Sequence, residues 1–208
     1  MDMRTLGMVL IVVVLVLTAA SEVIKRLLLS KVERLFAAGD FDGCLKVIGG
    51  SLARLTIPSF NREFMRLNAL ELKQDDEAAA EVIERLLRKG CSPKQRLALL
   101  ARGFEFYAAQ LDRDKASHML ELVESSGDKG LLRSCRVKFD IVFDKKSGYI
   151  HEMEEALPDA SPEERAQLCY LLSLQYENKG DKRRADEYLR KSLEVAGITE
   201  DAAKAAAK

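Results

Sequence analysis

Residues 166–197 read AQLCYLLSLQYENKGDKRRADEYLRKSLEVAG, and this stretch predicts two helices joined by a tight turn. Leu172 and Tyr176 lie four residues apart in the first helical stretch, so that they share one face. Gly180 marks the turn, and the small Ala185 follows on the facing stripe of the second stretch. Small residues beside large ones suit two helices that touch closely. A pair of this kind cannot bury its apolar face alone and must be stacked with others.

The pattern resembles the tetratricopeptide repeat (TPR) family, whose repeat is a helix–turn–helix of about 34 residues. The resemblance implies an all-α fold, an α-solenoid in which successive helix pairs stack on one another. It also implies a protein that binds other proteins in a concave groove. Another kind of α-solenoid is the alternative.

Turn signals recur along the chain at a similar interval. The spacings between successive predicted turns are 35, 37, 37 and 32 residues, for turns at Gly39, Gln74, Leu111, Gly148 and Gly180. This regularity predicts about five helix pairs within a solenoid domain over residues 22–197. The first four pairs are expected at 23–38 with 41–55, 60–73 with 76–89, 93–110 with 113–125, and 129–144 with 148–157. The fourth departs most, because Asp140 and Asp144 interrupt its first helix and its second helix is short.

The N-terminal residues 1–21 are predicted to form a transmembrane anchor. No charged residue occurs from Thr5 to Ser21, and a membrane-spanning helix needs about 20 residues, with a lower limit near 17. A signal peptide cleaved after Ala20 and a buried core helix are the alternatives. The anchor makes a single-pass membrane protein the expected localisation.

Basic residues follow this segment and set its expected orientation. An excess of Lys and Arg marks the cytoplasmic flank of a membrane helix, which predicts a cytoplasmic helical array. The membrane-flanking basic residues are Lys25, Arg26, Lys31 and Arg34. At the other end, the tail of residues 198–208 is rich in alanine and lysine and has strong helix propensity.

Composition and motifs favour binding over chemistry. Lys plus Arg and Asp plus Glu are equal at 33 each, so no overall positive field favours nucleic acid. The four cysteines are far apart, and His118 and His151 have no acid or nucleophile at a catalytic spacing. We therefore expect no catalytic residue, no metal ligand and no cofactor. The oligomeric state stays open.

A TPR array implies a groove lined by the first helix of each pair. The expected lining mixes apolar and acidic side chains, which favours a basic or amphipathic protein or peptide partner. The expected groove residues are Glu33, Phe36, Phe64, Asn68, Glu71, Ala101, Glu105, Ala108, Tyr170, Leu174 and Glu177.

The expected function is that of a membrane-anchored scaffold or adaptor, which binds a protein partner in this groove without turnover. One alternative is an exported or periplasmic-facing TPR chaperone that assists envelope assembly or secretion. Another is an accessory subunit that recruits substrate to a membrane enzyme. The sequence does not distinguish the partners of these three.

Overall fold

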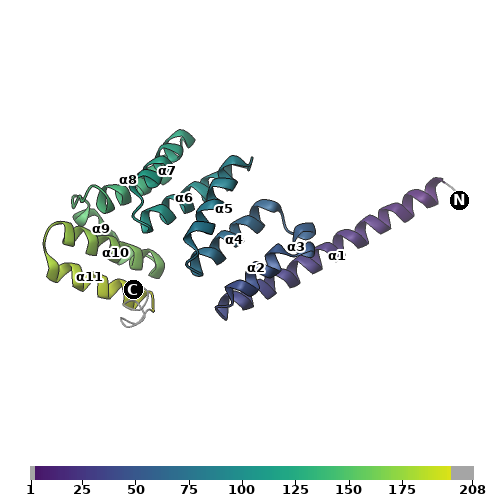
Figure 1. Ribbon diagram of the computed structural model, residues 1–208, viewed down its shortest axis with the longest axis horizontal. Helices are drawn as coiled ribbons and strands as arrows, with labels where there is room; N and C mark the ends of the chain where they lie inside the picture. Colours follow the sequence, from purple (N-terminus) through teal and green to yellow (C-terminus); the bar gives the residue numbers. More distant parts are fainter. Residues whose placement is uncertain (1–2, 198–208) are drawn as a thin grey trace. The chain divides into compact units, whose positions relative to one another are not determined.

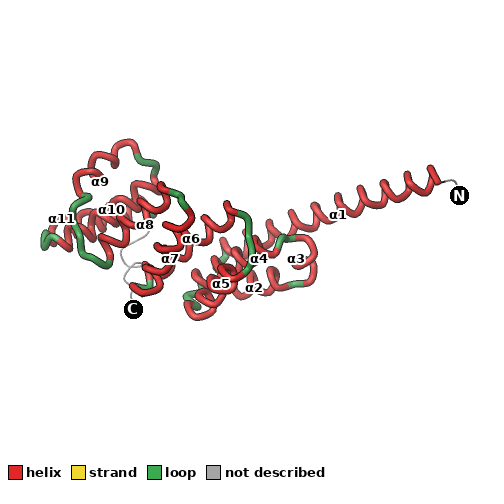
Figure 2. Tube along the Cα trace, turned by 90° about the horizontal axis from the view of Figure 1, so that it is seen from above, coloured by secondary structure: helices red, strands yellow, loops and turns green. Residues whose placement is uncertain are grey.

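A computed structural model describes the backbone of residues 3–197 and the side chains of residues 14–197. Every regular element in this part of the chain is a helix, as Figure 2 shows by its red segments. The chain divides into two compact units, residues 1–99 and residues 100–208, with the division inside helix α6. The prediction of an all-helical array is confirmed at this level.

The first unit is built on a long N-terminal helix and the pairs that follow it (Figure 1). Helix α2 packs against α1 and α4, α4 packs against α5, and α3 contacts α1. The buried cluster at the α1–α2–α4 junction contains Val32, Cys44, Ile48 and Ala69. The elements are α1 (Met3–Ala37), α2 (Phe41–Gly49), α3 (Ser51–Thr56), α4 (Ser59–Leu72), α5 (Asp76–Arg88) and the start of α6 (Pro93–Ala109).

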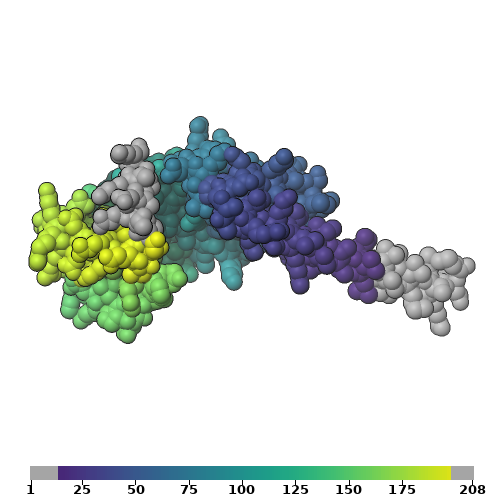
Figure 3. Space-filling model, turned by 90° about the horizontal axis from the view of Figure 1, so that it is seen from below, coloured from purple at the N-terminus to yellow at the C-terminus, as the bar shows by residue number. Residues whose placement is uncertain are grey.

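The second unit is centred on α10, which packs against α8, α9 and α11. Its core cluster contains Ile141, Met153, Leu171, Leu172, Tyr176 and Ala185. Helix α11 is the yellow part of Figure 3. Its Leu189 is 41% exposed. After α6 come α7 (Arg113–Ser126), α8 (Lys129–Val142), α9 (Ile150–Ala156), the 3-10 turn η1 (Leu157–Asp159), α10 (Pro162–Asn178) and α11 (Lys182–Val195).

One turn motif joins the two helices of most pairs. In these turns, one residue with a positive φ is followed by an aspartate, and this aspartate caps the second helix of the pair. At the fifth turn the Asp181 amide donates to the Tyr176 carbonyl at 2.9 Å, and the Asp181 carboxylate accepts from the Arg184 amide at 3.1 Å. The same arrangement occurs at Gly39, Gln74, Leu111 and Gly180, with φ of 71°, 61°, 56° and 82°. These are four of the five predicted turn positions.

The fourth pair breaks this rule. Its left-handed residue is Lys145 with φ of 54°, not the predicted Gly148. The first pair also differs from its prediction, because the second helix expected over 41–55 is divided at Gly50, which is extended (φ −68°, ψ 159°). Two successive glycines there weaken the helix enough for the chain to turn.

The predicted transmembrane helix of residues 1–21 is wrong. Within the described residues, no helix combines the length and the apolar character that a membrane crossing requires. In the part of α1 whose side chains are described, the uncharged run from Val14 ends at Glu22, and Lys25 and Arg26 follow within the same unbroken helix. The predicted single-pass membrane localisation is wrong for the same reason. The side chains of residues 1–13 and the predicted tail of residues 198–208 lie outside the described residues.

Candidate functional site

The second unit contains a groove of about 610 Å³ between α8, α9 and α10. It forms because α9 has only 7 residues, whereas α7 and α11 have 14 each. Pro158 follows α9 within η1, and proline cannot continue a helix because it lacks the amide hydrogen. The short α9 therefore leaves side chains of α8 and α10 uncovered. Glu105 of α6 completes one edge of the groove.

The floor of the groove is apolar. Val137 of α8 and Leu168 of α10 are half-buried and pack against the core of the unit, and Met153 and Leu171 belong to that core. Ala156 on α9 and Ala160 after η1 are small, so that the groove stays open between the larger side chains. A ligand that covered this floor would remove apolar surface from water, which is the main favourable contribution to association.

Charged side chains surround the floor. Arg133 Nη2 lies 2.6 Å from Glu152 Oε1, and Lys138 forms an ion pair with Glu105. Within each of these two pairs the positive and the negative charge offset one another. Asp159 and Glu164 also line the groove, and neither has a cationic partner among the residues that the structure describes. The lining as a whole has two basic and four acidic side chains, an excess of two negative charges.

Glu164 is held in place by the start of α10. The Ser161 amide donates to Glu164 Oε2 at 2.9 Å, and the Glu164 amide donates to Ser161 Oγ at 3.3 Å, a reciprocal capping box. The hydrogen bonds from Ser161 lower the pKa of the Glu164 carboxyl. Glu164 is therefore ionised at neutral pH, and its second oxygen, Oε1, remains available at the groove.

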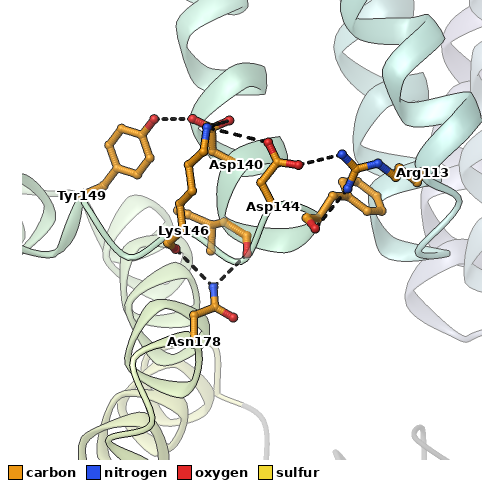
Figure 4. Close-up of polar contacts among 8 residues, drawn as sticks. Arg113, Asp140, Asp144, Lys146, Tyr149 and Asn178 are labelled. Atoms are coloured by element: carbon orange, nitrogen blue, oxygen red, sulfur yellow. Dashed lines mark hydrogen bonds and ion pairs between the residues drawn. The ribbon is translucent and has the colours of Figure 1, made fainter.

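A buried carboxylate fixes the segment that leads into α9 (Figure 4). Asp140 is only 7% exposed and accepts from Tyr149 Oη at 2.5 Å and from Lys146 Nζ at 2.9 Å. Burial acts to raise the pKa of Asp140, but the hydrogen bonds from Tyr149 and Lys146, together with the charges of Lys146 and Arg136, lower it overall. The ionised Asp140 thus holds the start of α9 against α8 through these hydrogen bonds.

Two further contacts brace the same segment (Figure 4). Arg113 of α7 pairs with Asp144 at 2.7 Å, and Asn178 Nδ2 donates to the Ile141 carbonyl at 2.9 Å and the Lys146 carbonyl at 3.1 Å. The polar residues of the irregular fourth pair, which interrupt the helical pattern in the sequence, therefore connect α7, α8 and α10 around the segment before α9.

The far side of α9 is joined to the last helix pair by Glu154. Its Oε1 accepts from Tyr176 Oη at 2.7 Å and from Tyr188 Oη at 2.8 Å, and the two rings are stacked with centroids 5.5 Å apart. These hydrogen bonds lower the pKa of Glu154. Because α9 is held by Asp140 at its start and by Glu154 within it, the groove wall that it forms is fixed.

Of the expected groove residues in the second unit, Glu105 is the one that lines this groove. Tyr170 is 43% exposed, and burial, then the charges of Glu177 and Glu105, raise the pKa of its phenol. Leu174 packs against the core. Ala101 is half-buried and Ala108 is buried.

In the first unit, the expected groove residues are partly engaged in packing. Phe36 lies edge-on to Phe41 with ring centroids 6.1 Å apart, and Phe64 stacks on Phe60 at 5.7 Å. Asn68 and Glu71 are half-buried, and Glu33 is exposed. A common binding surface for these residues stays a prediction.

The basic residues after the predicted anchor have local roles. Lys25 and Arg26 each lie 3.4 Å from Glu22 on the same helix, and Arg34 donates to the Ser30 carbonyl at 3.3 Å. Lys31 is exposed. Contacts of this kind on an exposed helix contribute little to stability.

Sequence reasoning missed the groove residues on α9 and η1, because it assigned the lining to the first helix of each pair. The signal was present in the short second helix of the fourth pair, which ends at Pro158 and leaves its neighbours uncovered. A short second helix predicts a gap over α8 and α10, and Glu152, Ala156 and Asp159 lie on the segment that borders this gap.

The described residues contain no group of His, Cys, Asp and Glu side chains placed to hold a metal ion. Cys44, Cys135 and Cys169 are buried. Burial, and next the charge of Glu105, raises the pKa of the Cys135 thiol to about 12, and burial also raises the pKa of Cys44 and Cys169. A thiol must ionise to act as a nucleophile, so these three are packing residues.

Comparison of the chain with protein-family models, curated proteins and solved structures gave no match. The indication of function therefore comes from the groove itself, with its open apolar floor, fixed walls and acidic rim.

Proposed function

We propose that this chain is a TPR-like helical adaptor, which binds a segment of a protein partner in the groove of its second unit. The groove carries the proposal, because it joins an apolar floor to oriented charged groups, as peptide-binding sites do. Its volume of about 610 Å³ accommodates several side chains of a ligand rather than a whole domain.

The recurrent turns support the TPR-like part of the proposal. A left-handed residue followed by a capping aspartate appears at intervals of 35 and 37 residues, from Gly39 through Gln74 to Leu111. This interval is close to the repeat of about 34 residues in the TPR family. A repeat that stacks its helices leaves an extended surface for a partner.

A binding function also fits the state of the polar residues near the groove. Asp140, Glu154 and Tyr149 are engaged by partners within the fold: Asp140 of α8 binds the segment before α9, and Glu154 joins α9 to α10. Groups saturated in this way stabilise the groove walls. Walls held in this way favour recognition of a ligand in the groove.

The proposal is tested by selecting peptides from a displayed random library against the full chain. Selected peptides are then titrated against Ala156→Trp, which places a large ring in the groove from an exposed position on α9. Ala98→Trp, on an exposed position of α6 outside the groove, is the matched control.

Peptides that bind the native chain and Ala98→Trp alike, but bind Ala156→Trp at least about ten-fold more weakly, support the proposal; ten-fold corresponds to about 1.4 kcal/mol. Selection of no peptide, or selection of peptides that bind Ala156→Trp as well as the native chain, contradicts it.

A further inference from the structure

We infer that the groove selects a basic amphipathic helix, with apolar side chains on the floor and a lysine or arginine at Asp159 and Glu164. This inference rests on the proposed function and adds the chemistry of the partner. Three features carry it: two carboxylates without an ion-pair partner at one end of the groove, the helical walls, and the ion-paired charges elsewhere on the rim.

The two carboxylates without an ion-pair partner lie where η1 meets α10. Asp159 and Glu164 both line the groove and are exposed, and neither forms an ion pair within the part of the chain that the structure describes. A cation on the ligand would gain a favourable interaction with either carboxylate, whereas the nearby Arg165 is bound to the Pro158 and Ala160 carbonyls at 3.3 and 3.2 Å. An anionic group at the same place would meet two carboxylates, and like charges opposed in this way weaken binding.

The walls suit a helix. Leu168 and Leu171 on α10 are three residues apart, as are Met153 and Ala156 on α9, so that each pair lies on one face of its helix. Val137 of α8 faces the same space. Rows of side chains on helices form ridges, between which the apolar face of another helix packs. A helix that docks in this way uses anchors at i, i+3 or i+4, and i+7.

The remaining rim charges restrict the orientation of this helix. Arg133 is paired with Glu152, and Lys138 is paired with Glu105. An acidic group on the ligand would meet Arg133 or Lys138 beside a carboxylate that already offsets its charge, and would gain less than a group that meets an unpaired charge. A basic group at Asp159 and Glu164 makes the larger gain. The rim therefore places the basic end of the ligand beside the start of α10.

The test uses three synthetic helical peptides that share one pattern of leucines and differ in the polar residue: lysine, glutamine or glutamate. Each is labelled and titrated against the full chain by fluorescence anisotropy, at low and at moderate salt. The protein variants are the double substitution Asp159→Asn with Glu164→Gln, and Glu163→Gln as the matched control. Glu163 is an exposed acid of the same helical turn that does not line the groove. Glutamine at 164 preserves the capping box.

We expect the leucine–lysine peptide to bind, and its affinity to fall as salt rises. The double substitution is expected to weaken it about ten-fold, as the loss of two exposed ion pairs would do, while Glu163→Gln leaves it within about two-fold. The leucine–glutamate peptide is expected to bind more weakly than the leucine–glutamine peptide.

Two results overturn the inference but leave the proposed function standing. One is that the glutamine peptide binds as tightly as the lysine peptide, with Ala156→Trp abolishing both. The other is that the lysine peptide does not bind although the displayed library yields peptides that Ala156→Trp rejects. Binding of the lysine peptide that Ala156→Trp leaves unchanged lies outside the groove and overturns the inference as well.

Discussion

Leu111 adopts a left-handed φ of 56° between α6 and α7, with its side chain 69% exposed. A side chain at this φ crowds the backbone and costs roughly 1–2 kcal/mol, which glycine avoids. The equivalent residue is glycine at positions 39 and 180. The turn is kept at Leu111 because the helices on either side and the Asp112 cap, which accepts from the Lys115 amide at 3.0 Å, impose it.

Leu111→Gly is expected to stabilise the protein by about 0.5–1 kcal/mol. The gain is smaller than the strain because glycine also gives the unfolded chain more freedom. Urea denaturation followed by circular dichroism measures the change. Leu111→Ala keeps a Cβ at the same φ and serves as the control, for which no gain is expected. A Leu111→Gly protein that is less stable than the native one would show that this turn is not strained.

Asp140→Asn is expected to destabilise the protein by about 2 kcal/mol at pH 7, because hydrogen bonds to a charged group are worth about 1.5–3 kcal/mol. The pKa of Asp140 is lower in the folded protein than in the unfolded chain, where it is about 3.9. Its stabilising contribution is therefore complete above that unfolded value and is lost as the pH falls through the folded value.

The measurement is the free energy of unfolding of the native and Asp140→Asn proteins from neutral to acid pH. The difference between them should shrink below about pH 4. The control is Asp144→Asn. Asp144 pairs with Arg113 and is more exposed than Asp140, so its substitution should lower the free energy of unfolding less at every pH. A difference that stays constant with pH would mean that the charge of Asp140 does not hold the segment before α9.

At the scale of elements, α10 is the central helix of the second unit. Its Leu172 is 0% exposed and lies in the core cluster, whereas Leu189 on α11 is 41% exposed. Leu172→Ala should cost about 2–5 kcal/mol, because it removes buried methyl groups and leaves a cavity. Leu189→Ala should cost about 1 kcal/mol or less. Chemical denaturation of both variants checks this; equal losses would contradict the packing described here.

Helix ends could be predicted where local chemistry sets them. Ser161 with Pro162 predicts the start of α10, and Gly180 with Asp181 predicts its boundary with α11. The turn before α9, whose left-handed residue is Lys145 and not Gly148, could not be predicted in this way, because contacts of Asp140, Tyr149 and Asn178 fix it. The polar residues that interrupt the helical pattern of the fourth pair are the ones that stabilise it.

At the scale of the molecule, each unit has its own buried cluster, around Ile48 in the first and around Leu172 in the second. Stability in stacked repeats is a sum of local terms, so a defect loosens its own neighbourhood first. We predict that Leu172→Ala speeds amide hydrogen exchange in α8, α10 and α11 but leaves α2 and α4 at the native rate. Faster exchange through both units alike would show one cooperative structure instead.

The sequence supports the helical array and four of its turns, because periodicity and capping are local properties. It misled at the N-terminus, where the apolar run predicted a transmembrane helix that the described part of α1 does not support. Of the site, Glu105 was found from the repeat register. Asp159 and Glu164 were missed. The groove exists because α9 is too short to cover α8 and α10, and this relation among three helices is not a local property of the sequence.

The most direct test of the account is a titration of one library-selected peptide against the native chain, Ala156→Trp and Ala98→Trp, with circular dichroism to show that all three have the same helix content. The account predicts that Ala156→Trp alone loses affinity, by at least about ten-fold, or about 1.4 kcal/mol. Equal affinity for the three proteins would contradict the central claim, because a groove blocked at Ala156 cannot hold the peptide.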